Sequence, residues 1–173
     1  NGGTLAYCIC VEELGRVCGS TGLTLAAHVS LGTYPIYAWG GDELKSEYVP
    51  KLIAGEYMGA YGLTEPNAGS DSGGTQTTAV LDGDEWIING RKCFCTNANH
   101  AGVVIITAVS NKELGKKGIS AFAVPASAPG YNLEPGETKL GMRGSDWASL
   151  VFEDCRIPRN HMLGPEYAGF STF

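Results

Sequence analysis

The sequence has few charged residues and little of what nucleic-acid or metal binding requires. Charged side chains make up 17% of the 173 positions, and 12 basic against 18 acidic residues give a formal net charge of −6. This balance argues against non-specific nucleic-acid binding, which needs a basic surface. The three histidines lack ligand spacing, which argues against a metal site. The hydrophobic share of 43% excludes a largely disordered chain.

Several well-known motifs are also missing. No apolar run approaches the ~20 residues that cross a bilayer, so we expect no membrane span. There is no phosphate loop ending in G-K-[ST] and no G-x-G-x-x-G dinucleotide loop. No C-x-x-C pair occurs, so we expect buried free thiols in a reducing compartment. The cysteines are Cys8, Cys10, Cys18, Cys93, Cys95 and Cys155.

Residues 4 to about 58 have a helical pattern. The almost wholly apolar run from 21 to 40 predicts a buried helix, in which His28 would be a satisfied core histidine. Asp42 is a suitable N-cap for the next helix, and Pro50 is expected to break or restart it. His100 and His161 are expected to be exposed in turns.

From about residue 59 the pattern changes to short apolar segments separated by Asp-Gly, Asn-Gly and Pro-Gly turns. Such regular spacing without a long helix predicts an antiparallel β-sandwich or barrel. We expect a turn at Asp82-Gly83-Asp84 and a type I′ hairpin turn at Asn89-Gly90. The predicted fold class is therefore α+β, with helices first and a compact β part after them.

The stretch YGLTEPNAGSDSGG, residues 61–74, lies at the junction of the two parts, where ligand pockets are common. Gly69 would allow a ligand to approach the main chain closely, and Thr64 and Ser70 offer hydroxyl groups. Composition alone leaves two interpretations open, a ligand cradle and an ordinary connection rich in turn residues.

The segment RKCFCTNA, residues 91–98, adds a second candidate. Phe94 and Thr96 point to the same face of a regular strand, because side chains alternate with a period of two. An aromatic ring and a hydroxyl on one face could contact a flat heterocycle. Composition alone, however, favours an ordinary core phenylalanine at position 94.

Taken together, YGLTEPNAGSD, INGRKCFCTNA and KLGMRGSDWASLVFEDCRIP resemble, in order and spacing, the acyl-CoA dehydrogenase family. The resemblance covers nearly the whole chain and is nearest to the short-chain (butyryl-CoA) and isovaleryl-CoA types. It implies that residues 1–58 are the C-terminal part of an N-terminal helical domain and residues 59–165 a middle β domain. Residues 166–173 would begin a C-terminal helical domain whose remainder is absent.

The resemblance implies an FAD cofactor at the face of the β domain. Leu63 would contact the flavin through its backbone, Thr64 through backbone and hydroxyl, and Phe94 would cover the ring. The implied cofactor-binding residues are Tyr61, Leu63, Thr64, Gly69, Ser70, Phe94, Cys95 and Thr96.

The resemblance also implies contacts with an acyl-CoA substrate from Ser70, Ser145, Asp146, Trp147 and Ala148. Trp147 and Ala148 stand where medium-chain members have threonine and then arginine. We therefore expect Trp147 to alter the CoA-side wall of the pocket or the packing of the next domain.

The implied reaction is α,β-dehydrogenation of an acyl-CoA thioester to the trans-2-enoyl-CoA, with short-chain substrates expected. Electrons would pass to an electron-transferring flavoprotein. Alternatives are a branched-chain or cyclic acyl-CoA dehydrogenase, an oxidase-like relative, and a non-catalytic acyl-CoA-binding relative.

No catalytic base is assigned, because the family's catalytic glutamate is expected beyond Phe173. Glu65 is expected to be structural, and Arg143 to order its turn by an ion pair. The resemblance further implies a homo-oligomer, usually a tetramer. Bacterial cytoplasm is the expected location, with the mitochondrial matrix as the alternative.

Overall fold

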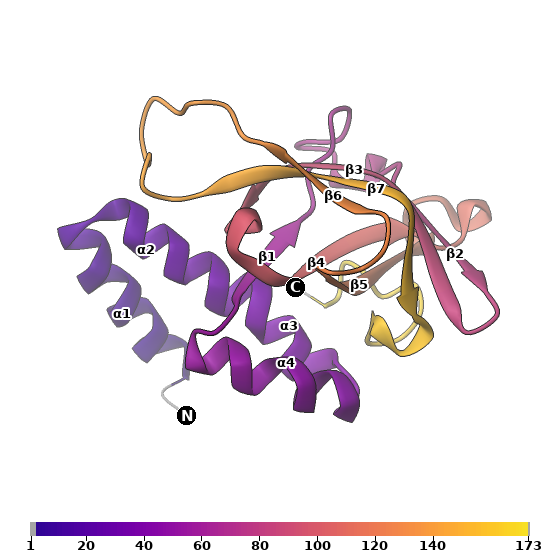
Figure 1. Cartoon of the computed structure of the whole chain (residues 1–173), viewed down its shortest axis with the longest axis horizontal. Coiled ribbons are helices and arrows are strands. Elements are labelled where there is room, and N and C mark those ends of the chain that lie inside the picture. Colours follow the sequence, from indigo (N-terminus) through magenta and orange to yellow (C-terminus); the bar gives the residue numbers. More distant parts are fainter. Residues whose placement is uncertain (1–2, 173) are drawn as a thin grey trace.

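The computed structural model describes residues 3–172. Asn1 and Gly2, at the start of the expected segment 1–58, and Phe173, at the end of the expected segment 166–173, lie outside the described residues. Helices come first along the chain and strands follow, as Figure 1 shows in indigo and then magenta to yellow. This confirms the predicted α+β order. The helical elements before the first strand are α1 (Gly3–Val17), α2 (Gly19–Ala26), the π-helical segment η1 (Ala27–Thr33), α3 (Tyr34–Trp39) and α4 (Asp42–Ala54). Short 3-10 helices lie between the strands at Ser72–Gly74, Ala98–His100, Lys112–Gly118 and Arg159–His161.

Elements α2, η1 and α3 follow one another without a break from Gly19 to Trp39. Ala27 and Ile36 are buried, whereas Tyr34 and Tyr37 are each 56% exposed. The predicted buried helix is thus buried on one face only, because the described chain packs against that face alone.

Helix α1 packs along α2 and has no buried residue. All six cysteines are free, but Cys8, Cys10 and Cys18 are exposed. The prediction of buried thiols is therefore wrong for these three and confirmed for Cys95 and Cys155. Among the described residues, no helix has the length and apolar character to cross a membrane.

Helix α4 differs from its prediction at two residues. Its N-cap is Gly41, and Asp42 is the first helical residue, where a carboxylate still interacts favourably with the helix dipole. The helix also continues through Pro50. Leu44 and Leu52 are buried on either side of the proline, and this packing outweighs the lost backbone hydrogen bond.

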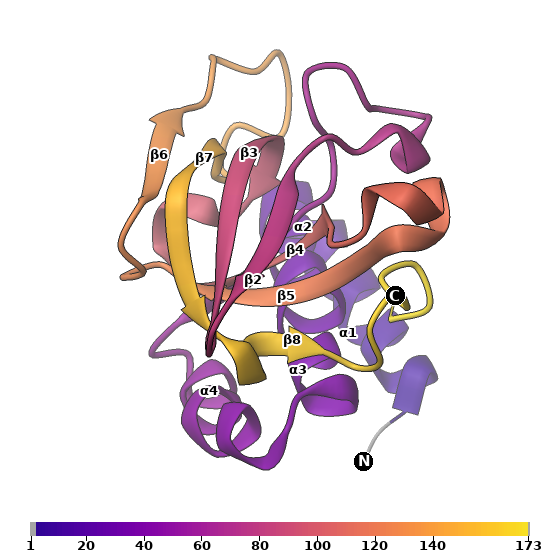
Figure 2. The same cartoon turned by 90° about the vertical axis from the view of Figure 1, so that its right-hand side faces the viewer.

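Within residues 3–172 the strands form one eight-stranded sheet in the order β6-β7-β3-β2-β4-β5-β8, with β1 paired to β4. In Figure 2, β7, β3 and β2 run across β5, so the sheet curves over on itself. This agrees with the predicted compact β part. The strands are β1 (Met58–Gly62), β2 (Thr78–Asp82), β3 (Glu85–Thr96), β4 (Ala101–Val109), β5 (Ile119–Pro125), β6 (Tyr131–Pro135), β7 (Trp147–Pro158) and β8 (Met162–Leu163).

Two pairings differ from the predicted antiparallel arrangement. Strand β1 lies parallel to β4, and β2 meets β4 in parallel at Thr78 and Val109. Loops rather than tight hairpins precede both strands, so no turn forces them to be antiparallel.

Strand β4 lies between two hydrophobic clusters that the described residues form. Val104 and Ile106 belong to the cluster inside the curved sheet. Val103 and Ile105 belong to the cluster between the sheet and helices α3 and α4. This alternation explains why β4 is apolar along most of its length.

The hairpin between β2 and β3 turns at Gly83-Asp84, as predicted, with Asp82 paired to Glu85. The turn predicted at Asn89-Gly90 is wrong, because β3 continues through it with a shift of register against β7. Gly90 has φ +147°, and a Cβ there would lie 2.5 Å from Thr77 Oγ1. The Asn-Gly pair therefore marks a bulge at a close chain approach.

His28 is satisfied as predicted. Its Nδ1 accepts the Gly59 N–H at 2.9 Å, and its Nε2 donates to Leu52 O at 3.2 Å. His161, by contrast, is buried and contacts Ala123 O through Nδ1 at 3.0 Å, so its predicted exposure is wrong. Burial lowers the pKa of both imidazoles. His100 is exposed, as predicted.

Residues 164–172 form turns and contain no helix. The domain boundaries at 58 and 165 remain predictions.

Candidate functional site

The candidate site is a hollow of about 220 Å³ between the π-helical segment η1, the end of β1 and the end of β3. Its lining residues are Ala27, Leu31, Tyr61, Leu63, Thr64, Cys93, Phe94 and Thr96. The sequence predicted Tyr61, Leu63, Thr64, Phe94 and Thr96. It missed Ala27 and Leu31, whose four-residue spacing in an apolar helix is the one available signal, and Cys93.

The helical wall of the hollow approaches the sheet through a contact of two glycines. A Cβ on Gly32 would lie 2.4 Å from the carbonyl carbon of Gly59 in β1. The backbones of η1 and β1 therefore touch, which brings Ala27 and Leu31 against the end of β1. π-Helical turns are frequent at functional sites.

A bulge in β3 forms the opposite wall. The pairing of β3 with β7 shifts between Lys92 and Cys95, and Phe94 within this bulge has φ +57°. Phe94 is 67% exposed, and it lines the same hollow as Thr96. Bulges that re-aim a side chain, and left-handed residues other than glycine, are both concentrated at functional sites.

Cys95 points away from the hollow. Its side chain is fully buried, its thiol donates to Tyr61 O at 3.1 Å, and burial raises the pKa of the thiol to about 12. Cys95 can reach a ligand in this hollow only through its backbone.

The hollow combines flat apolar surfaces with hydrogen-bonding groups. Tyr61, Leu63 and Phe94 supply the apolar surface. Within residues 3–172, the hydroxyls of Thr64 and Thr96 have no hydrogen-bond partner. This donor set fits a flat ring that carries polar atoms at its edge.

Two further hollows continue from the first. The second, about 470 Å³, shares Phe94 and Thr96 with it and is also lined by Leu23, Glu137, Thr138, Lys139, Gly141, Met142 and Trp147. The third, about 360 Å³, shares residues 137–139 and Trp147 with the second and adds Asn99, Pro135, Gly136, Arg143, Ser145 and Asp146. The three hollows lie next to one another at the ends of β3, β6 and β7.

Trp147 stands where these hollows meet. Its ring lies 5.2 Å from that of Phe94 between centroids, at an angle of 36°. Its indole N–H donates to Glu137 O at 3.2 Å. A Cβ on Gly136 would come within 2.4 Å of the indole, so the loop is fitted closely around Trp147.

Ser145 and Asp146 lie in the third hollow. Ser145 is 2% exposed, and its hydroxyl has no hydrogen-bond partner in the described part of the chain. Asp146 accepts the Asn99 backbone N–H at 3.0 Å, which ties the loop after β3 to β7. Ala148 is fully buried in the sheet core, so its side chain lines none of the three hollows.

The loop with Gly69 and Ser70 lies outside these hollows. Both residues are exposed, and a Cβ on Gly69 would meet no atom within 4 Å. The described chain therefore does not itself require a small residue at position 69, and the structure does not bring these two residues to Thr64.

Glu65 is structural in its surroundings, in line with the prediction. It is 5% exposed and forms an ion pair of 2.7 Å with Lys92, whose side chain is fully buried. No carboxylate of residues 3–172 lines the hollow at Thr64 and Thr96. Arg143 orders its turn by donating to Lys139 O at 2.8 Å, but the described residues give it no ion-pair partner.

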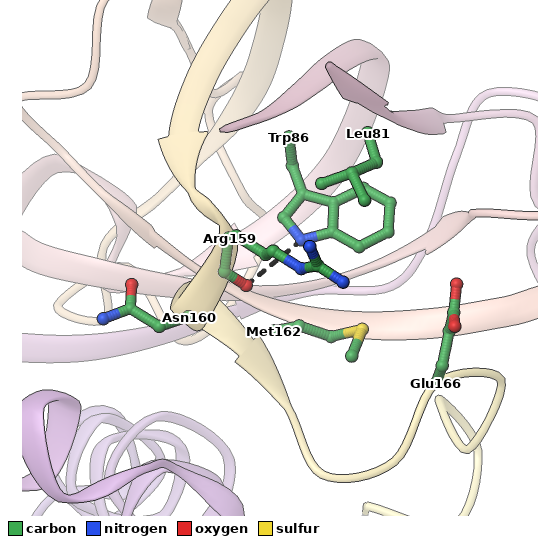
Figure 3. A pocket seen from close by; sticks show the side chains of 6 residues that line it. All are labelled: Leu81, Trp86, Arg159, Asn160, Met162 and Glu166. Carbon is green, nitrogen blue, oxygen red and sulfur yellow. Dashed lines mark hydrogen bonds between the residues drawn. The ribbon is translucent and has the colours of Figure 1, made fainter. Parts of the chain in front are cut away.

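A separate hollow of about 430 Å³, drawn in Figure 3, lies between the β2–β3 hairpin and the segment that runs from Arg159 through β8 to Glu166. Its lining residues are Leu81, Trp86, Arg159, Asn160, Met162 and Glu166. The Trp86 indole is already satisfied by Arg159 O at 3.2 Å. None of these residues was predicted to bind a ligand. Within the described residues, no group of histidine, cysteine, aspartate or glutamate could hold a metal ion.

Comparison with known proteins gives family matches over both parts of the chain. Residues 60–155 match the middle domain of acyl-CoA dehydrogenases, and residues 1–56 match the N-terminal domain of the same proteins. A short-chain-specific acyl-CoA dehydrogenase of Clostridium acetobutylicum is 48% identical over 98% of this chain and 45% of its own length. A probable acyl-CoA dehydrogenase of Bacillus subtilis is 49% identical over 99% of this chain and 46% of its own length.

Solved structures share the fold. Butyryl-CoA dehydrogenase from Megasphaera elsdenii gives a TM-score of 0.90 at 39% identity and covers 94% of this chain and 43% of its own. An acyl-CoA dehydrogenase complexed with FAD from Bacillus anthracis gives a TM-score of 0.86 at 36% identity. That match covers 94% of this chain and 28% of the solved chain. A structure described under the electron-transferring flavoprotein of Acidaminococcus fermentans gives a TM-score of 0.91 at 45% identity. That match covers 94% of this chain and 43% of the solved chain.

The chain thus spans less than half the length of these relatives. The family match nevertheless covers both its helical and its β part. The chain belongs to the acyl-CoA dehydrogenase family.

Proposed function

We propose that this chain supplies the cofactor face and part of the substrate path of an FAD-dependent acyl-CoA dehydrogenase with short-chain specificity. The observation that carries the proposal is the hollow in which Thr64, Phe94 and Thr96 meet. Family relatives bind FAD or its reduced form in solved structures.

The donor set of the hollow fits a flavin ring. The unpartnered hydroxyls of Thr64 and Thr96 would donate to polar atoms at the ring edge, and Tyr61, Leu63 and Phe94 would contact its flat part. Bound FAD supplies the acceptor for the two electrons that leave the substrate. Cys95 would take part only through its backbone, since its thiol is in the core.

The second and third hollows suit the elongated CoA thioester. The buried, unpartnered Ser145 hydroxyl and the polar groups around it offer hydrogen bonds along the path. Trp147 would form the wall between the two hollows. The proposed roles of Gly69 and Ser70 require contacts from outside the hollows, and Ala148 would act only by its backbone.

A carboxylate must remove the α-proton of the thioester. Glu65 cannot do this, because it is buried in an ion pair with Lys92. Asp71 forms an exposed ion pair with Lys116 at 2.8 Å. The resemblance to the family implies a glutamate beyond Phe173, and this is the base that we propose.

Short-chain specificity is supported by the relatives named for short-chain and butyryl-CoA substrates. Branched-chain and cyclic substrates, an oxidase-like activity and a non-catalytic role are the competing outcomes. The proposed electron acceptor is an electron-transferring flavoprotein. We also propose that the complete protein is a homotetramer. Its proposed location is the bacterial cytoplasm, with the mitochondrial matrix as the alternative.

The test is an anaerobic titration of the complete gene product with butyryl-, isovaleryl- and octanoyl-CoA, followed by visible absorbance of the flavin. We expect bleaching by butyryl-CoA at the lowest concentration. Bleaching first by isovaleryl-CoA would move the assignment to branched substrates, and rapid reoxidation in air would indicate an oxidase. The absence of bound flavin would contradict the proposal.

A further inference from the structure

The most heavily buried charge in the described chain lies directly behind the candidate site. Lys92 in β3 is fully buried, and its ammonium group has three partners. These are Glu65 Oε1 at 2.7 Å, Leu63 O at 3.2 Å and Thr107 Oγ1 at 3.5 Å. An ammonium group has three donors, so the site satisfies all of them.

Glu65 is equally well satisfied. Its carboxylate also accepts the backbone N–H groups of Gln76 at 2.7 Å and Thr77 at 3.0 Å. Burial raises the pKa of Glu65, but the hydrogen bonds from Lys92 and Thr77 outweigh this and leave the pKa below its ordinary value. Burial lowers the pKa of Lys92, and the hydrogen bond to Glu65 opposes this change, so each group compensates the burial of the other.

Stability alone is a weak reason for such a pair. The cost of removing two charges from water often exceeds their attraction, and apolar replacements of similar volume are frequently neutral or stabilising. The third contact, to Leu63 O, suggests another role, because Leu63 and Thr64 line the hollow.

The contact fixes the orientation of one peptide unit. In a trans peptide the C=O and the following N–H point in opposite directions. Since Lys92 holds the Leu63 carbonyl on the core side, the Thr64 N–H must point away from the core. Thr64 O in turn accepts the Cys93 N–H at 2.7 Å, so β3 holds both carbonyls. The described residues provide no acceptor for the Thr64 N–H.

We propose that the buried Lys92–Glu65 pair is a positioning device that presents the Thr64 backbone N–H to the ligand in the hollow. The positive charge behind the Leu63 carbonyl also polarises this peptide and strengthens its N–H as a donor. The hollow thereby gains a fixed, partly positive group without containing a charged side chain. The inference rests on the proposed function, in which the ligand is FAD.

The space around Lys92 is consistent with this role. A Cβ on Gly62, the last residue of β1, would lie 3.1 Å from Lys92 Cβ and 3.2 Å from its Cγ. The lysine stem therefore passes directly beneath the end of β1 and reaches Leu63 from below.

The test compares three variants of the complete gene product with the wild type. Lys92→Met/Glu65→Gln removes both charges and leaves Leu63 O without its donor. Glu65→Gln alone keeps the donor of Lys92 and an acceptor for it. Lys116→Met removes the exposed ion pair with Asp71 and serves as the control, since it lies outside the hollow at Thr64. The readouts are FAD affinity, the visible spectrum and reduction potential of the bound flavin, and urea unfolding.

We expect the double variant to bind FAD about ten-fold more weakly, as for the loss of one hydrogen bond, with a shifted spectrum and potential. Glu65→Gln should lose stability and should change affinity, spectrum and potential by less than the double variant, because Lys92 still donates to Leu63 O. Lys116→Met should change nothing. Wild-type affinity, spectrum and potential in the double variant would overturn the inference. Failure of the double variant to fold while Glu65→Gln folds would also overturn it, by making Lys92 a purely structural residue. Absence of flavin from the wild type would instead contradict the proposed function.

Discussion

The contact between Gly32 and Gly59 permits a sharp test, because two backbones touch there. A Cβ on Gly32 would lie 2.4 Å from the Gly59 carbonyl carbon, 2.5 Å from its Cα and 2.7 Å from the Ala60 nitrogen. All three are backbone atoms, so no side-chain rotation can relieve the contact. Gly32→Ala must therefore separate η1 from β1.

The magnitude follows from two opposing contributions. Overpacking a close contact costs about 1–3 kcal/mol, and a rigid backbone partner places Gly32→Ala near the upper value. Alanine in place of a helical glycine returns about 1 kcal/mol. The expected net loss is about 2 kcal/mol, which lowers the urea midpoint by about 1 M.

Gly15→Ala is the matched control. Gly15 is also helical, but a Cβ there meets no atom within 4 Å. This substitution should leave stability unchanged or raise it by about 1 kcal/mol. Urea unfolding of both variants decides the question, and a Gly32→Ala midpoint at or above that of the wild type would refute the backbone contact.

Three further predictions concern single side chains. Burial lowers the pKa of His161, so the unfolded chain binds a proton near pH 6.5 that the folded chain does not. The free energy of unfolding therefore falls as pH drops below about 6.5. Urea unfolding from pH 7 to 5 should show a smaller fall for His161→Gln than for the wild type. An equal pH dependence in both proteins would contradict this prediction. Gly90→Ala should cost about 2–3 kcal/mol, visible as a lower Tm, because φ is +147° and the new Cβ meets Thr77. Trp147→Thr should remove about 1 kcal/mol of ring contact with Phe94 and change the preference between butyryl- and octanoyl-CoA in anaerobic titrations; an unaltered preference and KM argue against a wall role for Trp147.

The sequence was sufficient for the order of elements and for much of the hollow. Phe94 and Thr96 were found because an aromatic and a hydroxyl lie two residues apart in a predicted strand, and Thr64 because it offers a hydroxyl in a glycine-rich stretch. The motifs that contain all three also resemble a known family. The alternation argument reached the right face for Phe94 and Thr96, although β3 is bulged there.

Other features depend on neighbours that are distant in sequence. Asn89-Gly90 has the composition of a hairpin, but pairing of β3 with β7 continues through it and turns it into a bulge. His161 lies three residues after Pro158 and resembles a turn residue, yet Tyr48 and Ala123 cover it. Pro50 remains helical because the residues around it are packed. Lys92 gave no signal at all, since a lysine in a strand is ordinarily solvent-exposed.

The bulge in β3 also gives the molecule a natural chemical probe. It places the half-buried residue Cys93 in the lining of the hollow and the Cys95 thiol in the core, two positions apart on one strand. The thiolate is the reactive form of cysteine, and the pKa of about 12 keeps Cys95 unreactive at neutral pH. Alkylation of Cys93, read against Cys95 within the same proteolytic peptide, would therefore report whether a ligand occupies the hollow, without any introduced label.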